Sequence, residues 1–216
     1  MNSHARFLSH SIIVPVGLHG ECNPDNKIMV YALLDDQSNI CFIKTSAIEK
    51  LNLHGPEVHL KLSTVLAEED IASEKITGLV VCSVNESTNI CLSRTYTRDI
   101  IPAKCSQIPK PETATKCPHL KRIADNLMPY EEEVDVALLL GINCARAIKP
   151  REIIQGNDND PNAKRTALGL GVVGMVEPDT YKREESVGVN HVAAYEVPFS
   201  PKKMLSLCSK DAHQDP

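Results

Sequence analysis

An apolar run that leads directly into a pair of acidic residues restricts the folds open to this chain. Residues 27–34 (KIMVYALL) have the length of a strand, contain Val and Tyr, and have polar residues on both sides. Five polar residues with turn character follow at 35–39, and residues 40–43 are apolar again. We therefore expect a buried strand that ends in an acidic loop, followed by a second short strand.

The middle of the chain is predicted to be largely β. Residues 58–66 alternate in part between apolar and polar side chains, as a strand with one buried face does. Residues 75–84 and 89–96 are two further strand candidates, joined by a polar tip. Before these strands, a helix of about two turns is predicted at 45–51, capped by Thr45 or Ser46.

The following part of the chain combines a loop, a helix and a second buried strand. Several prolines make residues 101–118 loop-like, and apolar residues at helical spacing predict a helix over 118–127. Residues 134–140 (VDVALLL) read as a buried strand, closed by Gly141 and a short helix at 142–148.

These patterns divide the chain into three parts. Residues 1–26 are an N-terminal flank with a possible strand, and 27–148 form one compact domain. Residues 149–216 are predicted to be a connector and a largely flexible tail, because they contain a polar linker (GNDNDP) and turn polar after Glu177. A further strand is possible at 167–175.

Charge, aromatic content and cysteine use narrow the classes of function. The net charge is −5 and only 4% of residues are aromatic, which argues against a nucleic-acid partner. No apolar run is long enough to span a bilayer or to form a secretory signal, so we expect no membrane partner. The 8 cysteines form no CxxC pair. We expect reduced thiols and an intracellular, cytoplasmic protein.

No cofactor or metal is expected. Cys105, Cys117 and His119 could form part of a metal site, as could His19 with Cys22. Neither set supplies four ligands at the spacing of a zinc finger.

The acidic loop resembles the active-site loop of retropepsin-like aspartic proteases. In that family an apolar pair precedes Asp-(Ser/Thr)-Gly-(Ser/Ala), and this chain has LLDDQSNICFI at the corresponding place. A second mark, VALLLGIN at 136–143, is similar to the apolar-apolar-Gly segment before the family's C-terminal helix. The order of these and the neighbouring segments, over about 11–175, resembles polyproteins of Pao/Bel-type LTR retrotransposons.

The resemblance implies a fold and a set of site residues. The fold would be mainly β, a retropepsin-like acid-protease barrel with one or two short helices. Asp35 would be catalytic, because Leu33 and Leu34 precede it as the family's apolar pair does. The residues expected to brace the loop are Asp36, Gln37 and Ser38, and the second motif consists of Leu139, Leu140 and Gly141.

The chain departs from the family pattern at three places. Asp36 stands where a hydroxyl residue is usual, and Gln37 stands where Gly is usual. The flap over the cleft would be a hairpin at 62–77, whose predicted tip at 67–70 contains no Gly and three acids.

Two functions follow, and the sequence leaves both open. The chain contains one such loop, so a protease built on it would be a homodimer with Asp35 from each copy. Its substrate would be a polypeptide, the element's own polyprotein. The alternative is a catalytically inactive remnant of the protease fold that acts as a peptide or protein interaction module.

Overall fold

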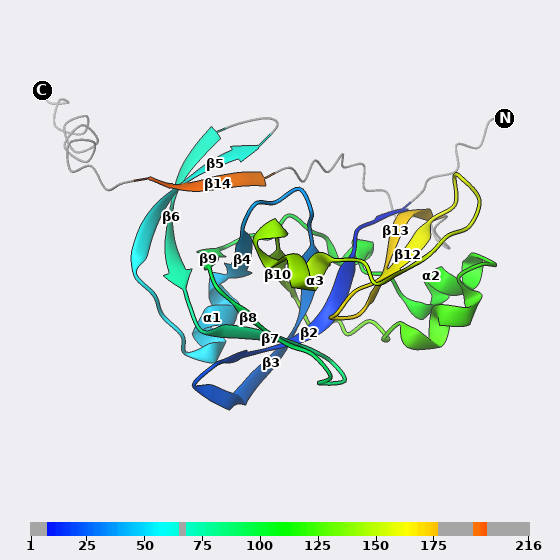
Figure 1. Ribbon diagram of the computed structural model, residues 1–216, viewed down its shortest axis with the longest axis horizontal. Coiled ribbons are helices and arrows are strands. Elements are labelled where there is room, and N and C mark those ends of the chain that lie inside the picture. The colour runs from blue at the N-terminus through cyan, green and yellow to red at the C-terminus, as the bar shows by residue number, and fades with distance from the viewer. Residues whose placement is uncertain (1–7, 65–67, 177–191, 198–216) are drawn as a thin grey trace, which may run out of the picture.

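The computed structural model describes residues 8–64, 68–176 and 192–197. This part of the chain is mainly β, with short helices, which confirms the predicted class at that level. The strands form a sheet of ten and a sheet of four (Figure 1).

The larger sheet draws strands from the whole described length of the chain. In spatial order it contains β14 (Val192–Val197), β5 (Glu57–Thr64), β6 (Glu68–Ile76), β9 (Thr95–Arg98), β4 (Cys41–Lys44), β10 (Val136–Leu140), β3 (Asn23–Leu34), β2 (Ile13–Gly20), β7 (Leu79–Ser83) and β8 (Asn89–Leu92). Two of these strands come from outside the predicted 27–148 domain: β2 from the N-terminal flank and β14 from the tail.

The topology around β10 determines where the acidic loop lies. β10 runs parallel to β3, with Leu140 opposite Leu34, and antiparallel to β4, with Leu139 opposite Phe42. Strands β3 and β4 follow each other in sequence, yet β10 lies between them in the sheet. The loop that joins β3 to β4 must therefore cross the end of β10.

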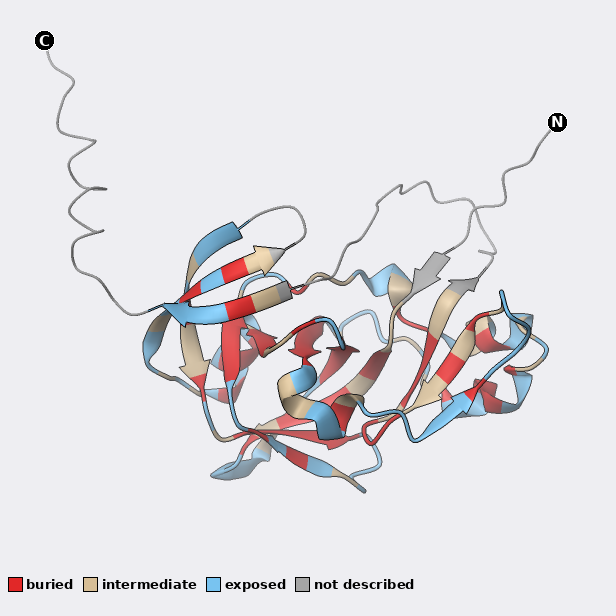
Figure 2. Cartoon of the chain, turned by 45° about the horizontal axis from the view of Figure 1, so that its top comes forward, coloured by how far each residue is buried: buried red, intermediate tan, exposed pale blue. Residues whose placement is uncertain are grey.

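The end of β3, at 30–34, and the whole of β10 are buried on both faces, which explains their continuous apolar sequences. Successive side chains of a strand point to opposite faces. Val30, Ala32 and Leu34 accordingly pack in one hydrophobic cluster, and Tyr31 and Leu33 pack in another. The buried strands at the centre of the molecule form this core in Figure 2.

Helix α1 (Thr45–Leu51) lies where the sequence predicts it and packs Ala47, Ile48 and Leu51 into the core. The expected cap by Thr45 or Ser46 is wrong. Lys44 takes the N-cap position without a side-chain hydrogen bond, and the Thr45 hydroxyl instead donates to Asp99 at 2.9 Å.

The smaller sheet is formed mainly by residues predicted to be a connector. It contains β1 (Leu8–His10), β13 (Leu170–Val176), β12 (Asn162–Arg165) and β11 (Glu152–Ile154), in that spatial order. Its buried residues, such as Val172 and Ile154, form a third cluster with Leu120 and Ile123. The connector strands therefore share a core with residues 114–127 of the predicted 27–148 domain.

The prediction of one helix over 118–127 is wrong. The chain instead forms α2 (Pro111–Lys116) and a 3₁₀ helix, η2 (Lys121–Asn126). Pro111 begins α2, because proline fits the first turn, where its missing N–H costs nothing. The remaining short helices are η1 (Cys105–Gln107), η3 (Ile142–Cys144) and α3 (Ala145–Ile148).

Within the described residues, no helix has both the length and the apolar character needed to cross a membrane.

Candidate active site

Asp35 follows the last residue of β3 and is held against the end of β10. Its side chain is buried, with 7% of the residue exposed. Its backbone N–H donates to the carbonyl of Leu140 at 2.9 Å, which extends the β3–β10 pairing by one residue. A carboxylate that leaves a strand buried on both faces in this way has little freedom to move.

The loop after Asp35 is organised by hydrogen bonds to its own main chain. The backbone N–H of Gln37 donates to Oδ1 of Asp35 at 2.9 Å, and this bond orients the carboxylate. Ser38 is fully buried, and its hydroxyl donates to the carbonyl of Ile40 at 2.9 Å.

Gln37 fits the position at which the family pattern has Gly. Among the described residues, the non-glycine residues with positive φ are Asn52 and Glu86, so Gln37 does not adopt the left-handed conformation. The loop uses the backbone N–H of this residue, which every amino acid except proline supplies. Its side chain is exposed and imposes no strain on the backbone.

Gly141 brings the second predicted motif against the loop. The N–H of Ile142 donates to the carbonyl of Ser38 at 2.8 Å. A Cβ at Gly141 would lie 2.6 Å from the same carbonyl oxygen and would also meet that of Ile40. The structure thus brings Leu140 and Gly141 against 35–38, while Leu139 pairs with Leu33 and Phe42 in the sheet. The close approach explains why a residue without a side chain stands at 141.

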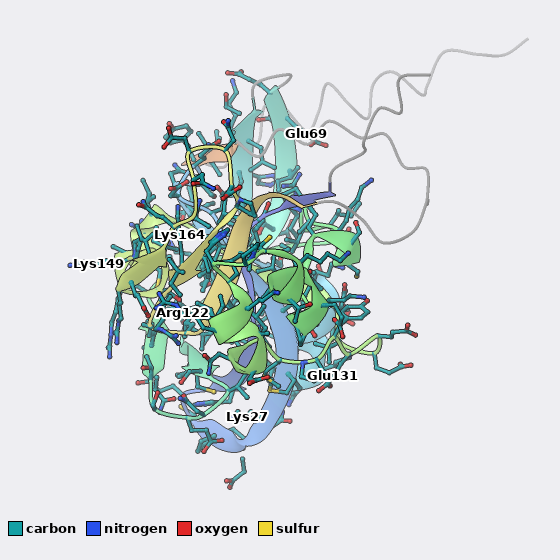
Figure 3. All side chains as sticks on the ribbon, turned by 90° about the vertical axis from the view of Figure 1, so that its right-hand side faces the viewer. Lys27, Glu69, Arg122, Glu131, Lys149 and Lys164 are labelled. Carbon is teal, nitrogen blue, oxygen red and sulfur yellow. The ribbon has the colours of Figure 1, made fainter. Side chains whose placement is uncertain are left out.

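Asp36 faces solvent beside an open cavity of about 650 Å³. The loop contributes Asp35, Asp36 and Gln37 to its wall. The wall also includes Lys149 and Lys164, both toward the left of the view in Figure 3. The cavity therefore combines two carboxylates with two ammonium groups.

The hairpin of β5 and β6 stands above the loop, but its tip differs from the prediction. Residues 68–70 are paired with β5, with Asp70 opposite Lys61, so they belong to strand β6. Residues 65–67, which include the first residue of the predicted tip, lie outside the described residues. Glu69 lies far out on this hairpin, at the top of the view in Figure 3.

Strand β14 lies between this hairpin and the acidic loop, and the sequence did not predict it. It pairs antiparallel with β5 over its whole length, from Val192 opposite Thr64 to Val197 opposite His59. Asn39, four residues after Asp35, binds the backbone of Ala194 twice: its amide donates to the carbonyl at 3.0 Å, and its carbonyl accepts the N–H at 2.8 Å.

Glu196 anchors the end of β14 to the larger sheet. It accepts hydrogen bonds from the Tyr96 hydroxyl and, at 2.6 Å, from Lys75. The ammonium group of Lys75 and the Tyr96 hydroxyl lower the pKa of the Glu196 carboxyl from its ordinary value. Burial, followed by the bond to Glu196, raises the pKa of Tyr96 to about 12, so Tyr96 remains a donor.

The contacts of Asn39 with Ala194 were not predicted from the sequence, which places Asn39 only among the five polar residues at 35–39. An amide side chain offers both a donor and an acceptor, as a peptide unit does. This chemistry was the available signal that Asn39 could bind the backbone of another segment.

The described residues contain no group of three or more His, Cys, Asp or Glu side chains placed to hold a metal ion. His119 instead lies 2.7 Å from the carbonyl of Pro161.

No protein-family model matches the chain, and neither a search of the curated proteins nor one of the solved structures gives a match.

Proposed function

We propose that this chain is a retropepsin-like aspartic endopeptidase derived from a Pao/Bel-type LTR retrotransposon polyprotein. One observation carries the proposal. The loop that bears Asp35 crosses the end of β10, and hydrogen bonds from Gln37 and to Leu140 fix it there. This arrangement holds a buried carboxylate rigidly at the wall of the cavity, as hydrolysis by an activated water requires.

The proposed enzyme is a homodimer, because an aspartic protease needs two carboxylates and the chain supplies one such loop. The exposure of Asp36 and Gln37 beside the cavity supports this, since they lie where the loop of a second copy could approach. Two Asp35 side chains held close together would share one proton.

The reaction would be hydrolysis of a peptide bond. The ionised Asp35 takes a proton from water as the water oxygen bonds to the carbonyl carbon, and the other Asp35 protonates the carbonyl oxygen. The C–N bond of the resulting diol then breaks: the first Asp35 gives its proton to the leaving nitrogen, and the second takes a proton from a diol hydroxyl, which restores the shared proton of the pair. The hairpin of β5 and β6 would cover a substrate bound in extended conformation, and the natural substrate would be the element's own polyprotein.

A second candidate function is a catalytically inactive module that binds peptides or proteins. The pairing of β14 with β5 favours this second function, because β5 and Asn39 already hold an extended segment through its backbone. Asp36, a charged side chain where the family pattern has a hydroxyl, also favours it.

Cleavage of a mixed peptide library across acid to neutral pH distinguishes the two functions. The oligomeric state is measured on the same sample, with Asp35→Asn protein and a pepstatin-type inhibitor as controls. We expect cleavage that both controls abolish. A folded dimer that cleaves nothing would contradict the enzyme and leave the binding module.

A further inference from the structure

The outer side of β5 accepts a strand, and in this structure the strand comes from the same chain. We call the β5 backbone at 59–64 together with the Asn39 side chain the docking edge. β14 forms the end of the ten-stranded sheet, and its neighbours in that sheet lie on one side (Figure 1). Without β14, β5 would present a row of unpaired N–H and C=O groups, the kind of edge that binds extended peptides.

The contacts at the docking edge are made mostly to the backbone of β14. Six consecutive residues pair with β5, and Asn39 adds two hydrogen bonds to the peptide groups of Ala194. Backbone pairing of this kind provides affinity for an extended segment whatever its sequence. The sequence preference must come from the side chains that point inward.

Among the β14 side chains that the structure describes, Ala194 and Glu196 lie on the face toward the molecule and define that preference. Ala194 is 3% exposed and lies opposite Leu62 in the same cluster as Leu33, which leaves room for a small side chain. Glu196, two residues later on the same face, has a side chain that is 40% exposed, and its recognition rests on its contacts with Lys75 and Tyr96 rather than on burial.

The outward side chains contribute little to recognition. Tyr195 is 61% exposed and Val197 is 41% exposed. The pattern read by the edge is therefore a small residue, any residue, and an acid.

We infer that the docking edge is a binding site for extended peptides with a small residue followed two positions later by an acid, and that residues 192–197 occupy it as a self-bound ligand. The inference rests on the proposed function in one respect: it takes the docking edge to be part of the substrate-binding site. A tethered strand competes at an effective concentration that is about millimolar for short flexible linkers. A free peptide binds well only after β14 leaves.

The test measures binding of a fluorescein-labelled peptide with the sequence of residues 190–199 to the full chain. All proteins carry Asp35→Asn, so the peptide is not cut. Two substitutions release β14: Glu196→Lys places a like charge opposite Lys75, and Ala194→Arg forces a bulky cation into a buried position. Tyr195→Arg is the matched control, because it introduces the same residue one position along, on the exposed face.

We expect both release variants to bind the peptide at least about tenfold more tightly than the parent protein and the Tyr195→Arg control. A second peptide, with Lys in place of the acid, should bind the Ala194→Arg variant at least about tenfold more weakly.

Three results would overturn the inference. The parent protein could bind the peptide as tightly as the release variants, or folded release variants could bind no peptide. Both release variants could also lose their β-sheet circular dichroism, which would make β14 a structural strand of the fold.

Failure of this inference and failure of the proposed function are separable. Peptide binding by inactive Asp35→Asn protein does not depend on cleavage, and the library assay on unmodified protein does not depend on tight binding of this peptide.

Discussion

At the scale of single residues, the acidic loop depends on main-chain groups more than on side chains. The carboxylate of Asp35 accepts from the N–H of Gln37, and its own N–H binds Leu140. Side chains at 36 and 37 point to solvent, so departures from the family pattern at these positions leave the loop's hydrogen bonds in place.

Gly141 is the residue whose substitution we expect to disturb the loop most directly. In Gly141→Ala, the added methyl group would meet the carbonyl oxygens of Ser38 and Ile40, which are backbone atoms and cannot move aside cheaply. Overpacking of this kind costs about 1–3 kcal/mol. Urea unfolding should show this loss, and any peptide cleavage should fall with it.

Gly20→Ala is the matched control, because a Cβ there meets the end of the Leu53 side chain at 3.2 Å, which can rotate away. Equal unfolding midpoints for the two variants would contradict the close approach at Gly141.

Cys41 is predicted to be unreactive in the folded protein. It is buried beside the loop, its thiol donates to Asn143 at 3.1 Å, and burial raises the pKa of the thiol to about 12. Because the thiolate is the reactive form, iodoacetamide at pH 8 should label the exposed Cys22 and Cys91 at least about 100-fold faster. Mass spectrometry of tryptic peptides reads the rates. Equal labelling of Cys41 would show that the loop opens.

At the scale of elements, the sequence predicted the two strands that build the site. The predicted strand at 27–34 and β3 both end at Leu34, and the predicted strand at 134–140 and β10 both end at Leu140. A polar loop or a glycine follows a continuous apolar run in each case, and such a boundary is a local signal. No local signal in the sequence predicted that the two strands pair with each other.

Elements defined by distant pairing could not be predicted in this way. β14 is a short strand with mixed polarity, and its partner β5 lies far away in the sequence. Its pairing depends on Asn39 and Lys75, which no local pattern connects to it. The predicted strand at 75–84 is instead interrupted at Gly78, which has a φ of 69° and turns the chain between β6 and β7.

The docking of β14 should weaken in acid. Lys75 and Tyr96 lower the pKa of Glu196 in the docked state. Ionised Glu196 therefore stabilises docking in full above the ordinary glutamate pKa of about 4.3. This stabilisation is lost as the pH falls through the lower pKa that Glu196 has in the docked state. Amide hydrogen exchange, corrected for intrinsic rates, should show less protection of 192–197 at pH 3.5 than at pH 6.

Glu196→Gln is the control for this effect, because the amide does not titrate in that range. If β14 in the unmodified protein were equally protected at both pH values, the ion pair would not contribute to docking.

At the scale of the whole molecule, two sheets meet beside the acidic loop. The cavity at Asp35 and Asp36 also includes Lys164 of β12 and Val173 of β13, so its wall spans both sheets. The chain brings one Asp35 to this place, and the proposed function requires a second copy to bring the other.

A subunit-mixing experiment tests this requirement most directly. Unmodified protein is unfolded and refolded together with Asp35→Asn protein at equal concentrations, and the cleavage rate of the best library peptide is compared with that of the same total amount of unmodified protein. If each active site needs Asp35 from both copies, random pairing leaves about a quarter of the activity. About half of the activity would mean that each chain cleaves by itself and would contradict the shared site.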